Sequence, residues 1–88
     1  MLRLTRTTRL PHEVILLLEG QIVAEWVELL EAECLTLLQT DQKVLLDLSG
    51  VSYLDRRAAR LLRELGARSV SLINTPPLVA DLVTEDAP

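Results

Sequence analysis

Aromatic side chains are almost absent from this chain of 88 residues, which has one tryptophan, Trp26, one tyrosine, Tyr53, and no phenylalanine. Hydrophobic residues nevertheless make up 49% of the sequence, so leucine, valine and isoleucine must fill the core. A chain of this length has the size of one domain. We expect a single domain with an aliphatic core over residues 1–84, followed by a disordered tail over residues 85–88.

Cysteine and histidine are equally scarce, since Cys34 and His12 are the only ones. A metal site needs several converging ligands, and a catalytic cysteine needs a nearby base. Cys34 falls in an apolar helical pattern and His12 follows Pro11 in an expected hairpin turn. We therefore predict a core position for Cys34 and a solvated loop position for His12, rather than a nucleophile and a pH switch. The three glycines stand alone and form no phosphate-binding loop, so we expect no cofactor, no metal and no enzymatic activity.

Long apolar runs are also missing. The longest covers residues 14–18, whereas a membrane-spanning helix needs about 20 apolar residues. The N-terminus has no apolar stretch of the kind found in signal peptides, and one cysteine cannot form an internal disulfide. A net charge of −4 disfavours non-specific nucleic-acid binding. We expect a cytoplasmic protein that neither inserts into a membrane nor binds nucleic acid.

Hydrophobic periodicity predicts alternating strands and helices. Strands are expected near residues 2–5, 14–18, 44–48 and 70–73, and helices over 24–39, over 55–65 and after 75–77. Gly20 and the pair Ser49-Gly50 are interpreted as strand ends, Asp55 as a helix N-cap and Gly66 as a left-handed helix C-cap. The order favours an α/β fold, a mixed four-stranded sheet with about three helices packed on it.

Arginines crowd the second expected helix. Three of them recur at i, i+4 and i+7, which places them in one stripe. Such a stripe can receive an acidic partner surface or an anion. It can equally be the solvated face of an amphipathic helix, paired with neighbouring carboxylates at little gain in stability. The partner-binding site that we predict comprises Asp55, Arg56, Arg57, Arg60 and Arg63. Trp26 either anchors an interface or covers the edge of the core.

The segment over residues 44–55, VLLDLSGVSYLD, resembles the central signature of the STAS family, the anti-sigma-factor antagonist domain also found in sulfate transporters. The order of strands, helices and a proline before the last helix agrees over about residues 13–83. The resemblance implies a single STAS-like domain that serves as a bacterial signalling and transcription-regulation module. Its expected partner is an anti-sigma factor of the serine-kinase type.

The resemblance fails at one turn. Antagonist members of the family carry Asp-Ser-Ser/Thr-Gly there, and a partner kinase phosphorylates the second hydroxyl. The matching residues here are Asp55-Arg56-Arg57-Ala58, with Arg57 at the acceptor position. We therefore expect protein binding without phosphorylation control. Two alternatives stay open: an accessory STAS subunit, such as those that brace the ATPases of phospholipid transporters, and a homodimer, because residues 78–83 hold surplus apolar side chains.

Overall fold

The structure, a computed structural model, describes the backbone of residues 2–85 and the side chains of residues 2–83. Its elements are β1 (Leu2–Leu10), β2 (Glu13–Ile22), α1 (Glu25–Leu38), β3 (Lys43–Leu54), α2 (Arg56–Ala67), β4 (Ser71–Ile73) and α3 (Pro77–Glu85). They form one four-stranded sheet in the order β1-β2-β3-β4. β1 is antiparallel to β2, whereas β2, β3 and β4 are parallel. The predicted mixed sheet with three helices is confirmed.

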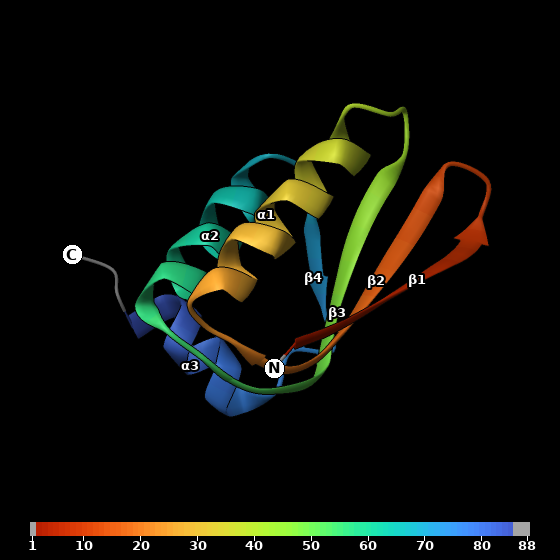
Figure 1. The fold of residues 1–88 in the computed structure, drawn as a ribbon. Coiled ribbons are helices and arrows are strands. Elements are labelled where there is room, and N and C mark those ends of the chain that lie inside the picture. Colours follow the sequence, from red (N-terminus) through yellow and green to blue (C-terminus); the bar gives the residue numbers. More distant parts are fainter. Residues whose placement is uncertain (1, 86–88) are drawn as a thin grey trace.

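All three helices lie on one side of the sheet (Figure 1). α1 connects β2 to β3, and α2 connects β3 to β4. Successive crossovers between parallel strands have the same right hand, so both helices cover the same face. The opposite face of the sheet carries no helix within residues 2–85.

The core lies between the sheet and the helices and is aliphatic, as expected. Alternate residues in the first halves of β2 and β3 point into it, which is the period of a strand with one covered face. Beyond the irregular pairing, Ile22, Val51 and Leu54 also lie in the core. Its largest fully buried side chains include Leu16, Leu18, Leu30, Leu46, Leu48, Leu62 and Leu65. Cys34 is completely buried among them, and this burial raises the pKa of its thiol from 9.0 to about 12. The predicted core position of Cys34 is confirmed, and His12 lies exposed in the β1–β2 turn.

Two strands run further than expected. Gly20 and Ser49-Gly50 do not end β2 and β3, because Gly20 pairs with Val51 and the strands continue to Ile22 and Leu54. The two strands pass so closely that a Cβ on Gly50 would lie 2.8 Å from the Cγ of Glu19. Glycine within a strand often marks such a close approach or a bulge, and the pairing is irregular on both sides of this point. β1 likewise extends from the expected four residues to Leu10.

The second helix also ends later than expected. Gly66 lies inside α2 without a positive φ, so the interpretation of Gly66 as a left-handed cap is wrong. The left-handed residue is Ser69, with φ 76°. The amides of Arg68 and Val70 both donate to the carbonyl of Leu65, at 2.9 and 3.0 Å, and this turns the chain toward β4. The expected tail over residues 85–88 falls mostly outside the described residues and stays a prediction.

Candidate protein-binding surface

Asp55 joins the starts of two helices. Its Oδ1 accepts a hydrogen bond from the backbone N–H of Ala58 at 2.9 Å, which confirms the predicted N-cap of α2. Its Oδ2 accepts one from the backbone N–H of Ala24 at 3.1 Å, directly before α1. Ala24 has φ 53°, a conformation that alanine rarely adopts, so this bond holds a strained connection in place. One carboxylate therefore orders both the α2 turn and the entry to α1.

Arg57 and Arg60 border a groove between α1 and α2. The Nη2 of Arg57 lies 3.4 Å from the Oε1 of Glu28, and both side chains are largely exposed, at 60% and 72%. The groove has a volume of about 140 Å³ and is lined by Val27, Glu31, Arg57, Arg60, Leu61 and Glu64. Val27 and Leu61 are buried and the four charged residues are exposed. The groove thus has an apolar floor and a rim of mixed charge.

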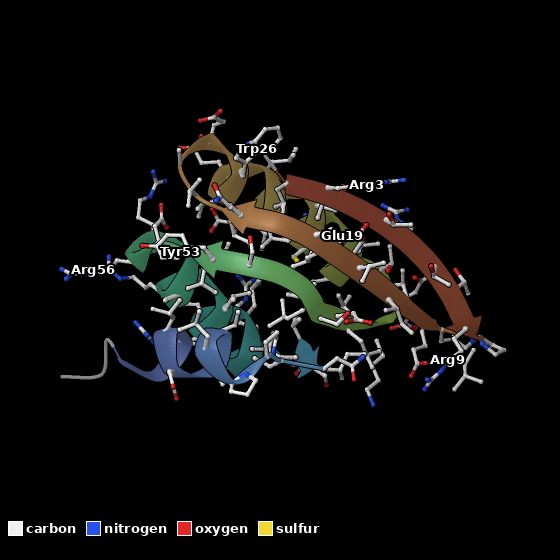
Figure 2. The ribbon with its side chains drawn as sticks, turned by 90° about the horizontal axis from the view of Figure 1, so that it is seen from below. Arg3, Arg9, Glu19, Trp26, Tyr53 and Arg56 are labelled. Atoms are coloured by element: carbon white, nitrogen blue, oxygen red, sulfur yellow. The ribbon has the colours of Figure 1, made fainter. Side chains whose placement is uncertain are left out.

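The other two arginines of the predicted site take different directions. Arg56, the first residue of α2, is exposed and extends away from the turn in Figure 2. Arg63 is half-buried, and its Nη1 donates a hydrogen bond to the backbone carbonyl of Val83 in α3. The half-buried Asp55 and the exposed Arg56, Arg57 and Arg60 all lie at the start of α2 and are named here the α2-start surface. The guanidinium of Arg63 instead ties α2 to α3.

Both aromatic residues lie at this same end of the molecule. Trp26, in the first turn of α1, is half-buried and packs against the core, while Tyr53 near the end of β3 is 46% exposed. Figure 2 shows Trp26, Tyr53 and Arg56 at the end of the sheet opposite to Arg9. Tyr53 is not among the predicted site residues, because the strand that carries it was expected to end near residue 48. Aromatic residues and arginine are the types most enriched where proteins bind one another.

Within the described residues, no group of three or more histidine, cysteine, aspartate or glutamate side chains is placed to hold a metal ion. None of the described helices is both long and apolar enough to cross a membrane.

The comparisons with known proteins agree with this fold. The model of the STAS domain family matches residues 4–81, so the chain belongs to the STAS domain family and the predicted resemblance is confirmed. The solved structure of the anti-sigma factor antagonist SpoIIAA in its unphosphorylated form is similar, with a TM-score of 0.70 and 21% sequence identity. That likeness covers 98% of this chain and 84% of SpoIIAA.

A crystal structure of Mglu is also similar, with a TM-score of 0.63 and 23% identity over 85% of this chain. The chain corresponds to only 20% of the length of Mglu. At such identities both likenesses describe the fold alone. No curated protein matches the sequence.

Proposed function

We propose that this STAS domain is a non-catalytic regulatory module that binds a protein partner through the α2-start surface, without phosphorylation control at that surface. The observation that carries the proposal is the turn over residues 55–58. It keeps the capping carboxylate that shapes the start of α2, yet presents two exposed arginines and no hydroxyl. A phosphate here would bring about two negative charges to a helix N-terminus that favours anions, whereas Arg57 brings a permanent positive charge.

The chemistry of the surface favours an acidic partner. Arg56, Arg57 and Arg60 are exposed, and only Glu28 offsets the charge of Arg57 directly. A carboxylate from a partner that replaces Glu28 would gain a charge-assisted hydrogen bond beside the apolar floor of the groove. The likeness to SpoIIAA in fold supports an anti-sigma factor of the serine-kinase type as that partner, in a cytoplasmic signalling or transcription-regulation process.

The test is to measure binding between this protein and an anti-sigma factor of the serine-kinase type. Trp26 is the only tryptophan of the chain, so its fluorescence reports directly on contact near the α2-start surface. Arg57→Glu combined with Arg60→Glu should weaken binding at least tenfold, because two attractions become repulsions. Arg68→Glu is the matched control, an exposed arginine at the far end of the same helix, and should change the affinity less than twofold.

Two results would count against this function. Absence of binding by the wild-type protein would remove the partner assignment. An equal loss of affinity in Arg68→Glu would show attraction by overall charge rather than by the α2-start surface.

One observation favours a second candidate, an accessory STAS subunit or a homodimeric scaffold. Leu78 on α3 is 60% exposed, although the neighbouring Val79 is buried. An exposed leucine on a short helix is suited to contact another subunit, as for a STAS domain that braces a transporter ATPase. The variant Leu78→Gln should abolish such an assembly and leave binding at the α2-start surface unchanged. Sedimentation of this variant, alone and mixed with the partner protein, separates the two functions.

A further inference from the structure

The sheet face turned away from the helices carries its own apolar group. Val14, Leu16 and Leu18 of β2 point into the core, so alternation along the strand turns Ile15 and Leu17 toward the opposite face. The same alternation and the strand pairing place Leu45 of β3 and Ile73 of β4 there. These residues, named here the open-face cluster, are Ile15, Leu17, Leu45 and Ile73. They are not among the residues that form or pack against the core under the helices.

The strand register places Asp47 between two members of this cluster. Ile15 of β2 pairs directly with Leu45 of β3. Asp47 of β3 pairs with Leu17 of β2 on one side and with Ile73 of β4 on the other. Leu45 is 7% exposed, and the other three members of the cluster are partly exposed. On the β1 side, the partners of Leu17 and Ile15 are threonines, which are short and keep that side of the cluster open. An apolar strip, interrupted by Asp47 between Leu17 and Ile73, therefore crosses the middle of the uncovered face.

Charged pairs frame the strip at both ends. At one end the Nε of Arg9 lies 3.4 Å from the Oε1 of Glu13, and Glu13 pairs along the sheet with Lys43. At the other end the Nε of Arg3 lies 4.0 Å from the Oε1 of Glu19. Figure 2 shows Arg3 and Glu19 next to each other, with Arg9 at the far end of the hairpin.

The remaining charge on this face is Asp47. Its Oδ1 accepts from the N–H of Ser49 at 3.0 Å and its Oδ2 from the Nδ2 of Asn74 at 3.2 Å. These bonds, the Ser49 amide first, hold the pKa of Asp47 below its ordinary value of 3.8. The face thus carries three cations, Arg3, Arg9 and Lys43, and three anions, Glu13, Glu19 and Asp47. It is neutral, whereas the whole chain has a net charge of −4, so the excess negative charge lies elsewhere on the molecule.

We propose that this uncovered face packs against the same face of a second copy of the chain. Two copies with a charge of −4 repel each other over most approaches, and the neutral face is where they can meet without that cost. A two-fold axis parallel to the strands places β2 of one copy over β3 of the other, as in two packed sheets. Ile15 then faces Leu45 of the partner subunit and Glu13 faces Lys43 of the partner subunit, while Leu17 lies over Asp47 of the partner subunit.

The dimensions of the face set the strength of this contact. Three strands about 4.8 Å apart, over roughly six residues of about 3.4 Å each, with the three residues of β4 beside them, give an area of roughly 350 Å² per copy. A total of about 700 Å² is smaller than a stable interface buries, so the dimer is weak and depends on concentration. Pairing between β1 edges is a less suitable contact, because the arginines of β1 would then meet one another.

The experiment measures self-association of the wild-type chain by sedimentation equilibrium from about 20 μM to 1 mM, a range suited to weak complexes. Ile15→Thr combined with Leu17→Thr removes apolar contact but keeps residues that favour strands. This double variant should lower the association constant at least tenfold. Leu29→Gln and Leu78→Gln, the matched controls on the helix side, remove exposed leucines of 44% and 60% exposure and should change it less than twofold.

A second measurement needs no variant. In spectra of the wild-type chain over the same concentrations, amide shifts should move for Ile15, Leu17 and Leu45 and stay constant in α2. A constant monomer mass up to about 1 mM would overturn the proposal, and so would loss of the dimer in Leu78→Gln, which would place the interface on α3. The open-face cluster lies apart from the α2-start surface, so this proposal and the proposed function fail independently.

Discussion

Removing the carboxylate of Asp55 should destabilise the whole domain, because two helix starts lose an acceptor at once. Loss of the N-cap bond to Ala58 costs about 1 kcal/mol. Loss of the bond to the exposed amide of Ala24 costs about 1 kcal/mol more, since water replaces part of it. The free energy of unfolding of Asp55→Ala should therefore fall by about 2 kcal/mol. For a domain of this size the melting temperature should fall by roughly 8 to 16 °C.

Urea unfolding at neutral pH measures this change, with the m-value as a check that the denatured state is unchanged. Asp55→Asn keeps one oxygen acceptor and should lose about half as much stability, since asparagine is also a good N-cap. Asp41→Ala, in the exposed loop before β3, is the control and should stay within about 0.5 kcal/mol of the wild type. A loss below about 0.5 kcal/mol in Asp55→Ala would refute the shared role of this carboxylate.

Three further predictions concern other sites. Gly66→Ala should raise the free energy of unfolding by about 0.5 to 1 kcal/mol, because a Cβ there meets nothing within 4 Å. Gly50→Ala should lower the free energy of unfolding by about 1 to 3 kcal/mol, because its Cβ would clash with β2. Urea unfolding measures both changes, and a change of the same sign in the two variants would contradict this prediction. Cys34 stays protonated in the fold up to about pH 12 but ionises near pH 9.0 when unfolded, so its contribution to stability is complete below pH 9 and is lost as pH rises from 9 to 12. Unfolding of Cys34→Ala should lack that loss, and an identical pH profile would argue against it. After incubation with the partner kinase and ATP, mass spectrometry should detect no phosphate at residues 55–58 of the wild-type chain. The double variant Arg57→Ser with Ala58→Gly should carry phosphate at that turn if the kinase recognises it.

Sequence patterns predicted the elements better than their ends. Period-two and helical patterns depend on which side chains are buried, and that requirement located all seven elements and the capping role of Asp55. Ser49-Gly50 has the composition of a turn, but its role depends on the passage of β2 beside it, which no local pattern reports. Gly66 was misread for a related reason: the reversal after α2 is made by Ser69 and the carbonyl of Leu65.

The candidate site was predictable only in part. Helical spacing gave the exposed positions of Arg56 and Arg60, and the turn signature gave Asp55 and Arg57. The contact of Arg63 with α3 was not predictable, because it depends on how a helix twenty residues further along packs against α2. The apolar runs over residues 14–18 and 44–48 do not distinguish the two faces of the sheet, whereas the structure covers one face with helices and leaves the other uncovered.

The carboxylate shared by two helix starts also affects how the native protein opens. Ala24 and Asp55 are 31 residues apart in sequence, so their bond closes a loop that contains all of α1 and β3. Displacing this one carboxylate breaks both of its bonds, so we expect the entry to α1 and the first turn of α2 to open as one unit. The amide protons of Ala24 and Ala58 should then exchange with solvent at matched free energies of opening. A partner that displaces the α2 turn would loosen the start of α1, with Trp26 in its first turn, in the same event.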